Sequence, residues 1–445
     1  MQLTEQQVLA LAPDNGAASN GKKLAQAKNW PLLGRSPRAL WGECQGSGSK
    51  PYQVRVDLAD FASKCSCPSF KFPCKHALGL LVLTANQPDL VQENGEPEWV
   101  GDWLDKRVDT AAKKEAKAIA KADAPVDEAA QQKRAEKRSE RVADGLAALQ
   151  VWLEDLVRNG LARLPAEGPG IWDQQAARLV DAQAPALAAR LRALADLPGS
   201  GADWPEQLLA ELGRIAVAVR AFERIDQLTP DLQHALRQYI GYTVREEDVL
   251  AAGQPVQDTW QVIGQMVEDN ERVRVQRTWV KGQHTGRHAL LLQFAVGAQP
   301  FGQSWLPGSS FNAELVFWPG AAAQRALLKG TASPAAASSQ FLHGVDFARL
   351  LDAASTTLAQ YPWVERCAAV LTGITPVLHA GRWFAVAADG QALPLAAGDH
   401  WHWLALSGGQ AFDVAVEWDG TLLRPLGLFI AGCYQPLSGG QLWTN

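Results

Sequence analysis

The chain has 445 residues, of which 47% are hydrophobic and 20% charged, so it is long enough for several domains with hydrophobic cores. This composition excludes a wholly disordered protein, and six cysteines are too few for a disulfide scaffold. The net charge of −5 excludes a uniformly basic nucleic-acid binder. No signal-peptide pattern and no window approaching 18 consecutive apolar residues is present, which predicts a cytoplasmic protein with no membrane segment.

Residues 1–104 are predicted to form an N-terminal region with a compact α+β core at 36–83. Apolar residues alternate with polar ones from Tyr52 to Leu58, the period of a half-buried strand. Residues 39–44 supply an antiparallel partner across the turn-rich stretch 45–51. The apolar run 76–84 predicts a short buried helix after this hairpin. If the unit extends beyond this core, Trp99–Leu104 belongs to it.

A charged segment is predicted at 105–144. Ala111–Glu136 contains ten alanines, and its only larger apolar residues are Ile119 and Val126, so it cannot bury a face. Its basic and acidic residues nearly cancel. We interpret the segment as a solvated linker, helical in part or disordered, with an interaction arm as the alternative.

Residues 145–250 are predicted to form an antiparallel helical bundle. Two stripes of apolar residues follow helical spacing, and they comprise Leu146, Leu149, Leu153 and Leu156, then Leu208, Leu212, Ile215, Val219 and Phe222. Asp203–Glu206 has the spacing of a capping box, and Thr229 precedes a first-turn proline.

The remainder, 251–445, is predicted to be a β-rich domain with a helical insert. Residues 290–296 and 383–388 resemble strands, and Asp389–Gly390 is a strong hairpin signal. Helical spacing from Val345 to Val370 indicates the insert. Asp399–Trp403 is expected to be an amphipathic strand with its tryptophans inward and its histidines outward, and a turn is expected around His284 and His288.

The clearest chemical signal is a group of four candidate ligands, Cys65, Cys67, Cys74 and His76. They form a Cys-x-Cys pair, a six-residue spacer and a Cys-x-His pair, and in an extended segment residues two apart point the same way. Three thiolates and one imidazole suit a tetrahedral Zn²⁺, and a closed shell favours a structural ion over a catalytic one. Isolated Cys367 and Cys433 are expected to be core thiols, and Cys44 is the only plausible spare ligand.

These residues resemble the SWIM zinc finger, whose signature is Cys-x-Cys, a variable spacer and Cys-x-His. The stretch from Trp41 to Gly48, followed by Pro51–Val54, is similar to the flank of bacterial members. The resemblance implies a ββα unit in which Cys65, Cys67, Cys74 and His76 share one Zn²⁺. It also implies binding of DNA or proteins, and it covers about 50 of the 445 residues.

The predicted finger is a basic module beside an acidic body. Residues 21–76 contain ten Lys or Arg and three acids, a formal +7, so the remainder carries −12. Three thiolates on one dication lower the finger's charge to about +6. A protein partner, nucleic acid contacted through Lys71 and Lys75, and a purely scaffolding role all remain open.

No catalytic motif is recognisable in the chain. Glycine-rich nucleotide loops, His-Glu-x-x-His and Gly-x-Ser-x-Gly are all missing from the sequence. We therefore expect a non-enzymatic, zinc-binding adaptor or regulatory protein, with DNA or other nucleic-acid binding as the alternative. The overall fold class is expected to be α+β, and the sequence leaves the oligomeric state open.

Overall fold

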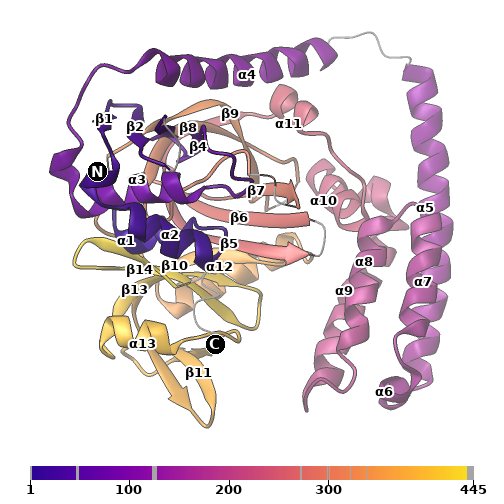
Figure 1. Ribbon diagram of the computed structural model, residues 1–445. Coiled ribbons are helices and arrows are strands. Elements are labelled where there is room, and N and C mark those ends of the chain that lie inside the picture. The colour runs from indigo at the N-terminus through magenta and orange to yellow at the C-terminus, as the bar shows by residue number, and fades with distance from the viewer. Residues whose placement is uncertain are drawn as a thin grey trace.

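The computed structural model describes residues 3–46, 50–122, 128–270, 273–297, 299, 301–320, 322–336 and 338–437. Figure 1 shows a β-barrel at the centre, a long helix α4 across the top, a group of helices on the right and a second sheet below the barrel. The fold is therefore α+β, as predicted.

The N-terminal unit is a four-stranded antiparallel sheet, in the order β1-β2-β3-β4, packed with helices. Its elements are α1 (Glu5–Ala10), α2 (Asn15–Leu24), β1 (Leu32–Arg35), β2 (Ala39–Cys44), β3 (Tyr52–Asp57), β4 (Ser63–Cys65) and α3 (Lys75–Asn86). The predicted hairpin is confirmed, since Ala39 lies opposite Asp57 and Cys44 opposite Tyr52. Residues 47–49 of its turn lie outside the described residues.

Helix α4 (Glu98–Ala122) joins this unit to the rest of the chain. Val100 and Leu104 are buried against Ala39 and Trp41, so Trp99–Leu104 packs with the N-terminal sheet. Further along, α4 packs on β9 and α11. The charged segment is helical on both sides of 123–127, which lie outside the described residues, and α5 (Glu128–Arg158) follows.

The predicted helical bundle is present. Its helices are α5, α6 (Leu164–Glu167), α7 (Gly170–Asp181), α8 (Pro185–Ala193), α9 (Trp204–Phe222) and α10 (Pro230–Ile240). Both predicted apolar stripes, on α5 and α9, are buried in one core. Thr229 caps α10 by accepting from the Leu232 N–H, whereas Asp203 precedes α9 without a side-chain capping bond.

A closed five-stranded barrel follows α11 (Glu246–Ala252). Its strands are β5 (Pro255–Asn270), β6 (Val273–Gly282), β7 (His288–Val296), β8 (Ser310–Phe317) and β9 (Arg325–Pro334). The order is β5-β6-β7-β9-β8, with β8 pairing back onto β5, and only β7 and β9 are parallel. Counted from β5, this is the strand order of the OB-fold, a five-stranded Greek-key barrel. Trp305 stacks on Phe311 in the interior, with ring centroids 4.0 Å apart.

The C-terminal unit is a six-stranded sheet in the order β12-β11-β10-β13-β14-β15. Its elements are α12 (Phe347–Gln360), β10 (Cys367–His379), β11 (Arg382–Val386), β12 (Ala392–Pro394), α13 (Trp401–Ser407), β13 (Phe412–Trp418), β14 (Leu423–Ile430) and β15 (Cys433–Pro436). The predicted turn at Asp389–Gly390 joins β11 to β12. The predicted helix ends at Gln360, and Val370 lies in β10 instead.

One prediction for this unit is wrong. Residues 399–403 enter helix α13 and do not form a strand. Trp403 is buried and Trp401 is 59% exposed, so the two tryptophans do not share a face. The alternation of His and Trp is equally compatible with a helix over so few residues, and packing of Trp403 against the sheet decides the outcome.

Side chains fix the units to one another. Gln7 of α1 donates to the Pro307 carbonyl at 2.8 Å, and Leu306 enters the finger's core. Trp363 is buried in the core of the helical bundle. Glu417 of β13 accepts from Arg277 and Trp279 of β6, across the interface between the barrel and the sheet. The N-terminal unit is therefore docked on the barrel.

Candidate metal centre

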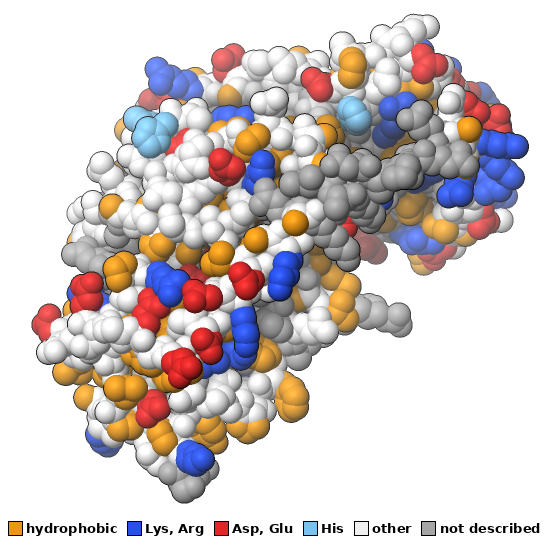
Figure 2. All heavy atoms as spheres, turned by 90° about the horizontal axis from the view of Figure 1, so that it is seen from above, with side chains coloured by type: hydrophobic (Ala, Val, Ile, Leu, Met, Phe, Trp, Pro, Cys, Tyr) orange, Lys and Arg blue, Asp and Glu red, His pale blue; other side chains and the backbone are white. Residues whose placement is uncertain are grey.

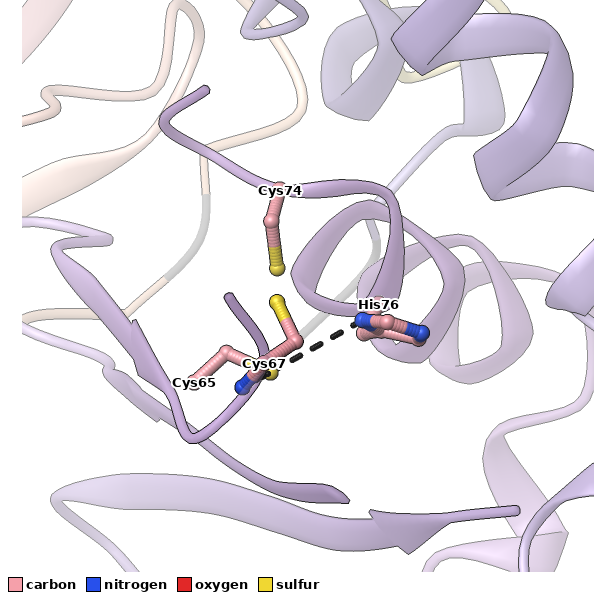
Figure 3. A group of neighbouring side chains, drawn as sticks. All are labelled: Cys65, Cys67, Cys74 and His76. Atoms are coloured by element: carbon pink, nitrogen blue, oxygen red, sulfur yellow. Dashed lines mark hydrogen bonds between the residues drawn. The ribbon is translucent and has the colours of Figure 1, made fainter. Parts of the chain in front are cut away.

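The structure brings together the four predicted ligands. Cys65 is the last residue of β4, and Cys67 follows it on the same side. Cys74 is the N-cap of α3, and His76 lies in the first turn of that helix. Figure 3 shows the three sulfur atoms and the imidazole pointing toward one another. A strand end and a helix start thus supply two ligands each, as the sequence pattern predicts.

The distances suit one zinc ion. The four candidate ligand atoms all lie within 4.8 Å of one another, and Cys65 Sγ is 3.8 Å from His76 Nδ1. A tetrahedral ion with Zn–S near 2.3 Å and Zn–N near 2.0 Å separates its ligand atoms by about 3.5–3.8 Å. The site therefore needs only small side-chain adjustments to hold Zn²⁺.

The three thiols affect one another's protonation. The hydrogen bond between Cys65 and Cys74, together with burial, raises the pKa of Cys65, whereas the same bond lowers the pKa of Cys74. The Ala77 N–H at the start of α3 also lowers the pKa of Cys74, as expected at a helix N-terminus. Burial raises the pKa of Cys67. Three thiolates this close together require a cation, which a divalent metal supplies.

The surroundings favour a structural ion. His76 is only 5% exposed, and the Tyr52 ring lies 4.8 Å from its imidazole. The seven residues after His76 in α3 are all buried. Four protein ligands complete a tetrahedral shell and leave no position for a substrate or a reactive water.

Other candidate ligands stay apart from this group. Cys44 is fully buried in the finger's core, and burial raises its pKa to about 11, so it is a neutral core thiol and not a spare ligand. Cys367 lies in β10, where burial also raises its pKa to about 11, and Cys433 lies in β15. Among the described residues, the Cys3His group is the only convergent cluster of metal-binding side chains.

The histidine pairs have structural surroundings. His400 Nε2 lies 2.7 Å from the Ala396 carbonyl, and His284 Nδ1 lies 2.8 Å from Asp258. The expected turn around His284 is present, and His288 begins β7. Neither pair converges on a shared position within the described chain.

Sequence reasoning missed a clasp between α4 and the finger. Arg107 donates to Asp57 at 3.1 Å and to Asp60 at 2.6 Å, and its guanidinium lies over the Trp103 ring. Arg55 lies over the rings of Trp99 and Trp103. The tryptophans of 99–104 were the available signal, but Arg55, Asp57 and Asp60 lie far from them in the sequence.

The comparisons with known proteins agree with this geometry. The SWIM zinc finger model matches residues 52–83, and the SWIM-associated four-helix bundle domain model matches residues 137–240. No curated protein and no solved structure matches the chain. The two matched segments occupy the finger and the bundle that the structure shows. This chain is a SWIM zinc finger domain-containing protein that holds one structural Zn²⁺.

Proposed function

We propose that the protein is a cytoplasmic, non-enzymatic adaptor that presents its zinc-bound loop to a protein partner. The observation that carries this proposal is the loop between the two ligand pairs, residues 68–73, hereafter the zinc loop. Phe70 in the zinc loop is 83% exposed and Phe72 is 39% exposed. An exposed aromatic side chain on a metal-fixed loop is a pre-organised anchor for a protein surface.

The helix beside the metal does not suit base recognition. His76–Leu83 of α3 is buried, so its side chains are unavailable to the grooves of a duplex.

The helices of the described residues include none with the length and apolar character of a membrane span.

Several basic side chains of the finger are already paired. Lys22 contacts Glu5, Arg38 contacts Glu96 and Asp105, and Lys71 contacts Asp14 at 2.7 Å. Figure 2, which views the molecule from the side of α4, shows acidic and basic side chains interspersed over much of that face. The formal +7 of the finger is thus partly offset by its own neighbours, which favours protein over phosphate as the partner.

Nucleic acid remains the alternative because Lys75 has no ion pair within the described part of the chain. Together with Lys71 it would supply phosphate contacts, and exposed Phe70 would supply a stacking surface. Such binding would weaken steeply with salt.

Affinity purification of the tagged full chain tests the adaptor proposal. A partner present in a fixed ratio should be lost with Phe70→Asp and retained with Leu209→Asp, a control at a 52% exposed position of α9. A variant that keeps its partner after Phe70→Asp contradicts the proposal. Salt-sensitive binding of a 30-nucleotide DNA strand, reduced at least tenfold by Lys75→Glu, would support the alternative instead.

A further inference from the structure

Strand β7 of the barrel has one open edge. One edge pairs with β6 along its whole length, from His288 to Val296. The other edge meets β9 only at Leu290 and Leu291. Leu290 donates its N–H to the Gln324 carbonyl on that side. Because backbone groups alternate along a strand, the N–H groups of Phe294 and Val296 point to the same edge, where no described strand pairs with them.

This open edge carries an apolar surface. Phe294 is 57% exposed and Val296 is 61% exposed, and Val275 of β6 lies directly opposite Phe294. The same face is continuous with the covered interface, because Leu290 and Trp279 pack under the C-terminal sheet. Residues 290–296 contain no charge and no proline, which are the usual means of blocking an edge strand.

The end of β7 also meets the zinc loop. A cavity of about 290 Å³ lies between them, lined by Phe70 and Phe72 of the zinc loop, Arg274 of β6, Gly297 after β7, and Asp14. Arg274 alternates with Val273 and Val275, so the cavity lies toward the opposite face of the sheet from Phe294. A strand added to β7 would therefore place alternate side chains on Phe294 and Val296, and its end would lie beside Gly297, which lines the cavity.

The charge beside the cavity is positive. Lys71 and Arg274 line the cavity with a single acid, Asp14, which contacts Lys71, and Lys71 is still 61% exposed. An acidic segment complements these two cations, whereas a basic one would be repelled.

From these features we infer that an extended, acidic and apolar segment of a partner protein binds as an added strand along the β7 edge. One set of its side chains packs on Phe294 and Val296, and the end of the segment beside Gly297 reaches the cavity lined by Phe70. Backbone hydrogen bonds to the edge supply affinity and the side-chain surfaces supply selectivity. This inference rests on the proposed adaptor function and specifies where and how that partner binds.

A peptide selection on the full-length, zinc-loaded chain tests the inference. Displayed random ten-residue segments should be enriched for alternating apolar and acidic residues, and fluorescein-labelled versions should bind the wild type. Phe294→Asp and Val296→Pro should each weaken binding at least tenfold, the latter by removing the edge N–H. The control, Val180→Asp at a 47% exposed position of α7, should bind within twofold of the wild type.

Hydrogen exchange adds a readout that a merely structural change would not produce. The bound peptide should slow exchange of the Phe294 and Val296 amides, while amides of α9 stay unchanged. Three results would each overturn the inference. The selection enriches no peptides, both edge variants bind the peptide as the wild type does, or the chain forms a concentration-dependent dimer that Phe294→Asp abolishes. If the natural partner is lost with Phe70→Asp but retained by both edge variants, the adaptor function stands and the strand addition is wrong.

Discussion

In the helical bundle, the predicted leucine stripe of α5 faces that of α9, and residues such as Leu149 and Leu208 are fully buried. In the zinc loop, none of residues 68–72 is buried. The first region is stabilised by removing apolar surface from water, which contributes about 25 cal/mol per Å². The second has almost no core of its own and depends on the metal at its two ends. Packing therefore fixes the bundle, and coordination fixes the surface proposed for partner binding.

Loss of a zinc ligand should give the largest difference between these regions. Cys74→Ser is expected to lose the ion and to unfold the zinc loop and β4, because zinc binding contributes about 10–16 kcal/mol in small zinc domains. Hydrogen exchange should show lost protection around Cys65 and unchanged protection in α9. The control Cys44→Ala should retain one zinc, since Cys44 is a neutral core thiol outside the cluster. Equal loss of protection in α9 would show that the regions are not independent.

Glu417→Gln should disrupt the junction between the barrel and the C-terminal sheet. The Glu417 side chain is 2% exposed and accepts from Arg277, Arg366 and Trp279. Removing its charge leaves Arg277, whose side chain is 8% exposed, with less negative charge beside it. The free energy of unfolding should therefore fall by about 3 kcal/mol. Urea unfolding followed by tryptophan fluorescence measures this loss. Zinc content should not change. Release of zinc from the folded variant would show that the metal site depends on this junction, which contradicts the account.

A cavity in the bundle should be costly without affecting the metal. Leu212 of α9 is 3% exposed, so Leu212→Ala should lower the free energy of unfolding by about 2–5 kcal/mol. Leu209 lies on the same helix but is 52% exposed, and Leu209→Ala should cost less than about 0.5 kcal/mol. Calorimetry of the two variants compares them directly. Equal costs would mean that packing does not fix this region.

The smallest expected effect is a pH dependence of the finger. Burial raises the pKa of Asp60 to about 6, although Arg107 opposes the shift. Because the folded-state pKa is higher than the unfolded one, stability from this group is greatest at low pH and is lost as the pH rises through 6. From pH 5 to 7.5 the loss is about 1 kcal/mol. Amide exchange of α3 should show this slope in the difference between the wild type and Asp60→Asn, because protonation of the zinc ligands at low pH affects both chains. A slope of opposite sign would contradict the assignment.

The metal site was predictable because its ligands are close in the sequence. Two one-residue spacings identify Cys65, Cys67, Cys74 and His76, and local strand and helix geometry brings each pair together. The bundle was predictable for a similar reason, since its stripes repeat with helical period.

Other features depend on contacts between distant residues. The strand order of the barrel, the clasp of Arg107 on Asp60 and the burial of Glu417 join segments far apart in the chain. Residues 399–403 form a helix start because Trp403 packs on the sheet, which no local pattern specifies. The open edge of β7 likewise appears only once the divergence of β9 is known.

The zinc content and metal coordination of the purified full chain test the central claim most directly. Elemental analysis should find one zinc per chain. X-ray absorption spectroscopy should show that it is bound by three sulfur atoms at about 2.3 Å and one nitrogen at about 2.0 Å. Less than half an equivalent of zinc, or a shell containing a water or carboxylate oxygen, would contradict a closed structural site that fixes the zinc loop.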